Sequence, residues 1–205
     1  MPKLGMEPVR RRQMIDATIR TIHELGFPNT SLAQVARRAG VSQGLVAHYF
    51  RDKAGLLEAT MRHIAAELKA EVVQHRRGLT DPGNRLDAVL EANFSARSFA
   101  PESLSAWVAF WGQTHRNPQL GRIQRVLRVR LKSNLAYDLR QLLPDAEARR
   151  IAQGLSIFVD GLSLRTAMGE RALDRETARA FAFDYLDTEL AKNGVIRERS
   201  YAAQG

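Results

Sequence analysis

The sequence contains no cysteine among its 205 residues. This absence excludes disulfides, thiolate zinc sites and a cysteine nucleophile, and it fits a reducing cytoplasm. The chain also lacks any run of about 18 apolar residues, so no segment is expected to span a membrane. The first residues, MPKLGMEPVRRRQ, lack the apolar stretch of a signal peptide. We therefore expect a cytoplasmic protein with no membrane partner.

Signals for catalysis and for metal binding are scarce. The chain has no glycine-rich phosphate loop, and its five histidines, at positions 23, 48, 63, 75 and 115, include no pair four residues apart. Neither pattern supports a bound cofactor or a metal site. We therefore expect a protein that is not an enzyme.

Positive charge is in clear excess. The net charge is +9 and the calculated pI is about 10.6. A strongly basic protein suggests a polyanionic partner, with nucleic acid as the first candidate. Charge alone leaves a merely basic surface as an equal alternative.

Helical periodicity runs through nearly the whole chain, and no alternating strand pattern persists. Gly26, Gly40 and the segment TDPGN at residues 80–84 interrupt it, as helix-ending residues do. The sequence therefore predicts an all-α fold of about nine helices. They are expected over residues 8–25, 31–39 and 42–50, from 52 onward, and near 84–97, 102–114, 118–143, 145–168 and 175–191.

The segment VSQGLVAHYF, residues 41–50, forms the second half of a predicted helix-turn-helix. Two short helices, each preceded by a serine that can cap it, are joined by a tight turn at Gly40. Leu45, Val46 and Phe50 would pack inward. The opposite face would then be small, with little charge, and could enter a major groove.

Polar groups on that outward face suit base recognition. Gln43 and His48 can hydrogen-bond base edges, and Gly44 adds no bulk. The flanking cations suit DNA phosphates, which position a protein without reading sequence; they are Arg37, Arg38, Arg51 and Lys53. An ordinary helical hairpin with a basic rim is the alternative.

At these residues a family resemblance becomes visible. The stretch TSLAQVARRAGVSQGLVAHYFRDKAGLLEATM, residues 30–61, resembles the DNA-binding domain of TetR-type repressors. The start of the chain and the later segments AFWGQ, RLKSNL and DGLSLR resemble the BetI-type members, choline-responsive repressors of glycine betaine synthesis genes. The resemblance implies a homodimer that binds an inverted-repeat operator on double-stranded DNA. It also implies an N-terminal three-helix DNA-binding domain, placed at residues 1–58, and a helical ligand-binding and dimerisation domain at 59–205.

Family positions carry over to particular residues. Gln43, Gly44 and His48 resemble the base-reading positions. Phosphate contacts are expected from Tyr49, whose ring can also pack in the core, and from Lys53. The remaining DNA-binding candidates are the hydroxyl groups near the starts of the two short helices, Thr30, Ser31 and Ser42.

Aromatic residues in the second half suggest a site for a cation. Trp107 and Trp111 lie four apart on one helical face, and Asp160 lies in an apolar helix where a carboxylate needs a partner. A quaternary amine such as choline is held by aromatic faces and balanced by an anion. The further candidates are Phe94, Asn134 and Tyr137. For the tryptophans, ordinary core packing is the favoured alternative from the sequence alone. For Asp160, a salt bridge to Arg165 or to another helix is an equal alternative.

The last two predicted helices are expected to form the dimer. Their apolar stripes are Ile151, Leu155, Phe158 and Leu162, and Ala178, Phe181, Ala182 and Tyr185, with Gly154 and Gly161 allowing close approach. Packing within one chain is the alternative. The basic run RIQRVLRVRLK, residues 122–132, is interpreted as a solvated helix face with acidic partners elsewhere. Two other functions stay open: a TetR-type repressor that responds to a different ligand, and a ligand-free architectural DNA-binding protein.

Overall fold

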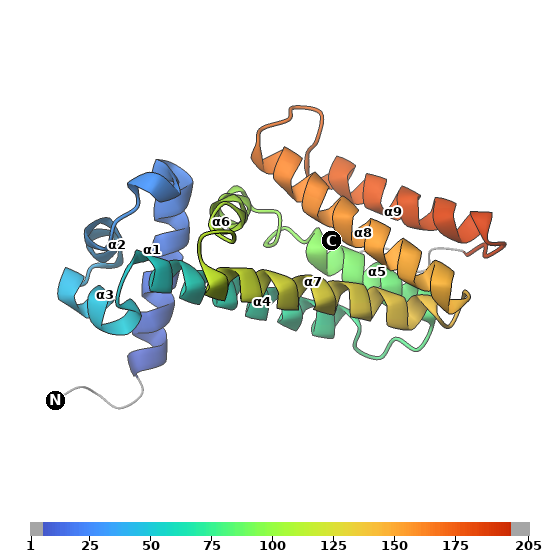
Figure 1. Cartoon of the computed structure of the whole chain (residues 1–205), viewed down its shortest axis with the longest axis horizontal. Helices are drawn as coiled ribbons and strands as arrows, with labels where there is room; N and C mark the ends of the chain where they lie inside the picture. Colours follow the sequence, from blue (N-terminus) through green and yellow to red (C-terminus); the bar gives the residue numbers. More distant parts are fainter. Residues whose placement is uncertain (1–5, 198–205) are drawn as a thin grey trace. The chain divides into compact units, whose positions relative to one another are not determined.

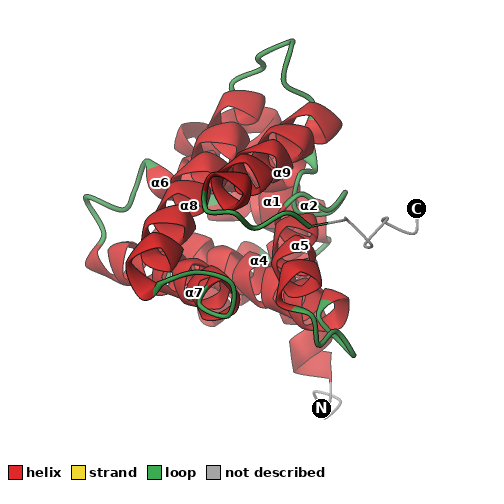
Figure 2. Ribbon diagram, turned by 90° about the vertical axis from the view of Figure 1, so that its right-hand side faces the viewer, coloured by secondary structure: helices red, strands yellow, loops and turns green. Residues whose placement is uncertain are grey.

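The computed structural model describes residues 6–197. These residues contain nine helices and no strand, which confirms the predicted all-α fold (Figure 1, Figure 2). In this part of the chain no helix has the length and apolar character needed to cross a membrane. In order the helices are α1 (Met6–Asn29), α2 (Leu32–Ala39), α3 (Gln43–Phe50), α4 (Lys53–His75), α5 (Pro82–Asn93), α6 (Pro101–Trp111), α7 (Pro118–Leu139), α8 (Asp145–Ala167) and α9 (Arg175–Lys192).

Local sequence accounts for most helix ends. Gly26 interrupts α1 with φ 73° and ψ 155°, a conformation that glycine adopts without a steric penalty. Asp81 and Asp174 cap α5 and α9 by accepting hydrogen bonds from backbone N–H groups three residues ahead, both at 2.8 Å. Two helices end four residues before the expected point, α5 at residue 93 and α7 at residue 139, because turns follow them.

The chain divides into two compact units. The first contains α1 to α3, α4 up to Ala66, α6, and α7 up to Gln124; the second contains the rest of α4 and α7 together with α5, α8 and α9. Helix α6 belongs to the first unit because it packs along α1. The compact units thus differ from the division at residues 58 and 59, which stays a prediction about function.

The core of the first unit joins the helix-turn-helix to α1 and α4. As predicted, Val46 and Phe50 are buried. On α1, Ile15 is buried with them, whereas Leu25 is exposed. Tyr49 packs against this core and stays partly exposed. The buried cluster consists of Met14, Ile15, Ala17, Val35, Ala36, Val46, Phe50, Leu56 and Ala59.

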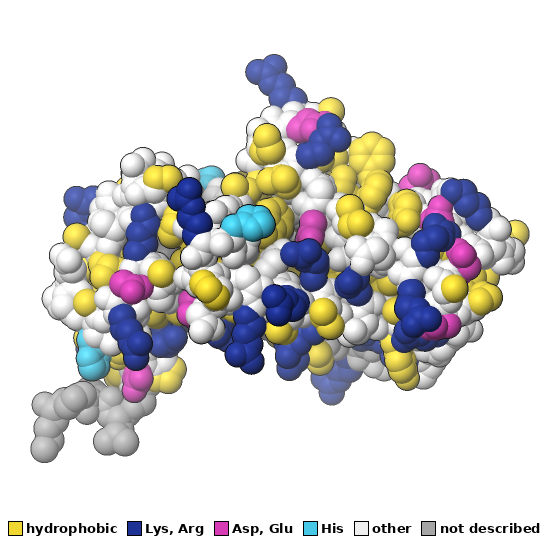
Figure 3. Space-filling view, in the orientation of Figure 1, with side chains coloured by type: hydrophobic (Ala, Val, Ile, Leu, Met, Phe, Trp, Pro, Cys, Tyr) yellow, Lys and Arg dark blue, Asp and Glu magenta, His cyan; other side chains and the backbone are white. Residues whose placement is uncertain are grey.

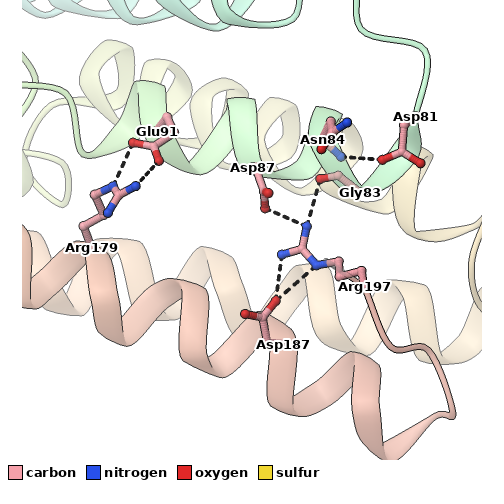
Figure 4. Close-up of polar contacts among 8 residues, drawn as sticks. All are labelled: Asp81, Gly83, Asn84, Asp87, Glu91, Arg179, Asp187 and Arg197. Carbon is pink, nitrogen blue, oxygen red and sulfur yellow. Dashed lines mark hydrogen bonds and ion pairs between the residues drawn. The ribbon is translucent and has the colours of Figure 1, made fainter. Parts of the chain in front are cut away.

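In the second unit, ion pairs tie α5 to α9 and to the segment after it (Figure 4). Arg179 donates hydrogen bonds to both carboxylate oxygens of the buried Glu91, one of them at 2.8 Å. Arg197 donates to Asp87 at 2.7 Å and to Asp187 at 2.8 Å. Burial strengthens such pairs but also raises their desolvation cost, so their value lies in fixing the register of the two helices.

Helices α8 and α9 pack against each other, and this corrects the predicted dimer stripes. The side chains of Ile151, Leu155, Ala178 and Ala182 are fully buried inside the chain, and Leu162 is 8% exposed. They form core between the helices, because an amphipathic helix first buries its widest apolar stripe within its own domain. The outward side carries three other residues of the predicted stripes, Phe158, Phe181 and Tyr185, together with Ile157 and Leu164. All five are exposed or half-buried.

Candidate nucleic-acid interface and ligand-binding residues

The helix-turn-helix is built by two capped helices and one left-handed glycine. Ser31 and Gln34 form a reciprocal capping box at the start of α2. Gly40 has φ 66° and ψ 34°, and the N–H of Val41 returns to the Ala36 carbonyl at 3.0 Å. These bonds close the turn after α2 and fix the direction in which α3 begins.

Ser42 caps α3 by accepting a hydrogen bond from the N–H of Leu45 at 3.2 Å. Residues 40–44 also match the letters G-x-S-x-G, the spacing of the nucleophile elbow of serine hydrolases. That elbow needs a strand before the serine, whereas helix α2 precedes Ser42 here. The motif is therefore a helix cap, and Ser42 has a structural task whether or not it also contacts phosphate.

One face of α3 is exposed, and it carries the predicted base-reading residues. Gln43, Gly44 and His48 are all exposed, whereas Val46 and Phe50 on the opposite face are buried. The space beside Gly44 is open, since a Cβ added there would meet no atom within 4 Å. The packing of the described chain therefore does not require glycine at this position.

Two of the predicted phosphate contacts are already engaged within the chain. Thr30 is 3% exposed, and its hydroxyl donates to the Gly26 carbonyl at 2.9 Å. This geometry makes Thr30 part of the turn and does not support donation to phosphate. Exposed Ser31 donates to the Gln34 side chain at 2.9 Å, so its hydroxyl would have to exchange partners to bind DNA.

Lys53 is held more firmly than a free surface lysine. Its ammonium donates to the Pro28 carbonyl at 3.0 Å and lies 4.3 Å from the centre of the Phe27 ring. Partial burial lowers the pKa of Lys53. A phosphate contact would use the remaining N–H groups of a charge already fixed in place.

The basic rim is weaker than the sequence suggested. Arg38 forms an ion pair with Glu24, so its charge is largely offset. Arg37 and Arg51 are exposed, and no carboxylate of the described chain pairs with either. Of the four flanking cations predicted to contact phosphate, Arg38 is therefore not free.

Trp107 and Trp111 form an aromatic pair in the first unit. Their rings are 5.8 Å apart and tilted by 31°, and both side chains are half-buried. Fully buried Phe110 packs edge-on against Trp107 at 5.8 Å. The two tryptophans thus pack in an aromatic cluster without being fully buried, and their role in ligand binding stays a prediction.

Phe94 belongs to the core of the second unit. It is 0% exposed and packs 5.0 Å from Phe99. A ring enclosed in this way offers no face to a ligand, so the structure does not support its predicted ligand-binding role. The sequence pattern could not distinguish this phenylalanine from one that lines a site.

Asp160 is the most unusual acidic group of the second unit. Burial raises the pKa of Asp160, and the Arg128 guanidinium partly opposes this. Among the described residues no hydrogen bond or ion pair holds its carboxylate, and Arg165, the expected partner, pairs with Glu170 at 2.6 Å. The predicted salt bridge to Arg165 is therefore wrong, and Asp160 is a half-buried carboxylate with Arg128 as the cation that acts on it.

The other two candidates of the second unit lie on α7. Asn134 is half-buried. Tyr137 is 58% exposed, and the Arg85 guanidinium lies 5.2 Å from its ring centre. One face of this ring thus already carries a cation.

Sequence reasoning missed two polar groups of α7. The amide oxygen of Gln124, a residue 9% exposed, has no hydrogen-bond partner within the described chain. Asp138 is fully buried between Arg76 at 2.8 Å and Arg85 at 2.9 Å. Burial raises the pKa of Asp138 and the two guanidiniums oppose this. Only their spacing on the inner face of a helix could have revealed them.

The basic run of α7 is exposed, as predicted, and its Lys and Arg side chains gather along α7 in Figure 3. Ion pairs to acidic side chains, also expected, are not found there within the described residues. Lys132 instead donates to the neutral Gln153 at 3.0 Å. Across residues 6–197, no group of three or more acidic or histidine side chains is placed to hold a metal ion.

Comparison with known proteins settles the family. Residues 14–60 match the family described as bacterial regulatory proteins of the tetR family, and residues 82–191 match the C-terminal domain of BetI-type transcriptional repressors. This chain belongs to the TetR family of transcriptional regulators, with a BetI-type C-terminal domain. It is therefore a DNA-binding regulator and not an enzyme.

Relatives of nearly the same length share this assignment. The transcriptional regulator BetI of Burkholderia mallei (strain NCTC 10229) is 48% identical over 192 residues, 93% of this chain and 98% of its own. BetI of Ectopseudomonas mendocina (strain ymp) is 45% identical over 94% of this chain and 99% of its own.

Solved structures show the same fold. A transcriptional regulator from Pseudomonas aeruginosa PAO1 has a TM-score of 0.74 and 27% identity, covering 91% of this chain and 93% of its own. A regulator from Saccharomonospora viridis, solved in complex with choline, has a TM-score of 0.79 and 20% identity over 88% of this chain and 96% of its own.

Proposed function

We propose that this protein is a dimeric, cytoplasmic repressor of glycine betaine synthesis genes that choline releases from its operator. The observation that carries the proposal is nearly full-length identity of 45–48% to BetI regulators. The exposed Gln43, Gly44 and His48 face of α3 supports DNA reading by the helix that such proteins place in the major groove.

The proposed operator is an inverted repeat. A two-fold dimer offers two copies of α3, which reach one face of B-DNA when the half-sites lie one helical turn apart, about 34–36 Å, or a multiple of it. Selection from a random duplex library followed by footprinting tests this. A single unrepeated half-site protected by a monomer would contradict it.

The proposed dimer contact is the outward side of α8 and α9, called here the dimer face. Ile157 is 61% exposed and Phe181 is 51% exposed. On the same two helices, the rings of Phe158 and Tyr185 stack with their centres 5.0 Å apart. Hydrophobic side chains are also visible over these helices in Figure 3. Exposed apolar groups of this size favour burial against a second copy.

Ile157→Asp tests that face. It should convert the dimer to a monomer in sedimentation experiments and abolish operator binding, because one α3 cannot span two half-sites. Val73→Asp, on α4 and 60% exposed, is the matched control and should leave the dimer intact. Dissociation by the control alone would place the contact elsewhere.

Choline is proposed as the inducer on two separate features. The half-buried tryptophan pair offers aromatic faces, each worth about 0.5–2 kcal/mol to a quaternary ammonium. The separate second feature is the half-buried carboxyl of Asp160 in the second unit. The solved S. viridis regulator, which holds choline, is consistent with this ligand.

Calorimetry of choline into free and operator-bound protein tests both binding and coupling. By linkage, if choline weakens operator binding by some factor, operator must weaken choline binding by the same factor. Equal affinities in the two titrations would rule out equilibrium induction. No heat with any quaternary amine would assign the protein to a TetR-type regulator of another ligand.

A further inference from the structure

The start of α1 carries three consecutive arginines, Arg10 to Arg12, and all three are exposed. Arg12 pairs with Asp16 at 3.4 Å. In the described part of the chain, Arg10 and Arg11 form no ion pair with any carboxylate, and the acidic residue of the first turn, Glu7, is exposed. Two cations at this end of α1 are therefore available to an outside anion.

Arg11 is positioned at the carboxyl end of α3. Its guanidinium carbon lies 5.0 Å from the centre of the Phe50 ring, and Phe50 is the last residue of α3 (Figure 1). The ring is 4% exposed, so it is a rigid support. A guanidinium over an aromatic ring can still direct N–H groups to another partner.

Arg51 follows Phe50 on a backbone that is equally fixed. It has φ 65° and ψ −64°, and hydrogen bonds of 2.8 Å join its N–H to the Ala47 carbonyl and the next N–H to the Phe50 carbonyl. The nearby carboxylate of Asp52 accepts a hydrogen bond from the Gly55 N–H at 2.8 Å. Exposed Arg51 therefore adds a positive charge at the end of α3 that Arg11 contacts.

A phosphate needs such cations at this end of a helix. The carboxyl end of α3 carries the negative pole of the helix dipole and unpaired carbonyl groups, which repel an anion. Guanidinium groups reverse the local sign and bind phosphate oxygens with two parallel hydrogen bonds. The amino end of α3 attracts phosphate without help.

We propose that Arg11 and Arg51 at the carboxyl end of α3, together with Arg10 beside Arg11 in the sequence of α1, form a phosphate-binding edge. The edge contacts the sugar-phosphate backbone beside the half-site that α3 enters, and it adds affinity without reading sequence. The inference rests on the proposed function, since its ligand is operator DNA. Continuity with the exposed face of α3 and charge complementarity identify the occupant.

Salt dependence of DNA binding tests the edge. Fluorescence anisotropy would compare Arg10→Ala, Arg11→Met and Arg51→Ala with the wild type on an operator duplex and a scrambled duplex. Each substitution should weaken both duplexes by the same factor and reduce the slope of log K against log salt by about 0.9 per contact, or about 1.8 per dimer. The factor by which each variant binds DNA more weakly than the wild type should therefore fall about tenfold between 50 and 200 mM salt.

Two comparisons separate a phosphate contact from simpler effects. Arg171→Ala, in the exposed loop between α8 and α9, removes the same charge elsewhere and should leave the slope unchanged. Arg11→Met keeps the packing on Phe50, so its melting temperature should match the wild type. Unchanged slopes in all three edge variants, or an equal fall in the control, would overturn the proposal. Wild-type protein that bound both duplexes alike would overturn the proposed function instead.

Discussion

Replacing Gly44 with alanine should separate DNA contact from stability. Gly44 is the second residue of α3, is exposed, and does not have a positive φ. A Cβ there would meet no protein atom within 4 Å. Nothing inside the chain therefore opposes alanine, and a helix prefers it.

The stability change follows from the unfolded chain. Glycine loses more backbone freedom than alanine on folding, so Gly44→Ala should stabilise the protein by about 0.5–1 kcal/mol. For a protein of this size the melting temperature should rise by about 1–4 °C. Circular dichroism during heating measures it.

Operator binding should change in the opposite direction. A methyl group on the face that enters the groove pushes the start of α3 away from the base edges. Loss of one good base contact costs about 1–3 kcal/mol, which is about 5-fold to 150-fold in affinity. Anisotropy on the same preparation would measure it, and the loss should be smaller on scrambled DNA.

The reverse substitution provides a control. Ala180→Gly on an exposed position of α9 should destabilise the helix by about 1 kcal/mol, with no effect on DNA affinity. A Gly44→Ala variant that is more stable and still binds operator as tightly as the wild type would refute the reasoning, because α3 would then not approach DNA at its start.

Three further outcomes are expected. Gly55→Ala should destabilise the first unit by about 1–3 kcal/mol in urea unfolding, since a Cβ would lie 2.2 Å from the Phe50 carbonyl oxygen; wild-type stability would contradict the close approach. Asp160→Asn should weaken choline binding yet stabilise the apo protein at neutral pH. The raised pKa of Asp160 means that the folded chain holds its proton longer, so wild-type stability falls as pH rises from the unfolded to the folded pKa, and the gain from Asn should vanish in acid. Glu91→Ala should cost about 1–3 kcal/mol by leaving Arg179 half-buried without its carboxylate, and a second change, Arg179→Met, should recover part of it; a Glu91→Ala variant as stable as the wild type would show that the pair contributes little.

Local features of the sequence determined the DNA-binding half well. Ser31, Gly40 and Ser42 specify caps and a left-handed turn through bonds that span only a few residues, so their effect can be deduced without the rest of the chain. The inward and outward faces of α3 followed from helical spacing for the same reason. The family motif lies in this segment because DNA binding requires the local geometry of the helix-turn-helix.

Tertiary packing decided what local pattern left open. Thr30, Arg38 and Lys53 looked like free donors to phosphate, yet each has a partner that is distant in sequence or formed only by the folded turn. Phe94 and the stripe at Ile151 and Leu155 proved to be core. A helical period reveals that a face is apolar, but it does not show which neighbour covers it.

For Asp160 too, the sequence predicted one feature and tertiary packing decided another. The sequence by itself identified a carboxylate in an apolar helix and the need for a compensating charge. Only the folded chain showed that Arg165 pairs with Glu170 and that Arg128 is the cation acting on Asp160. Partner choice depends on distances between helices and on competition among charges, and neither exists until the helices have packed.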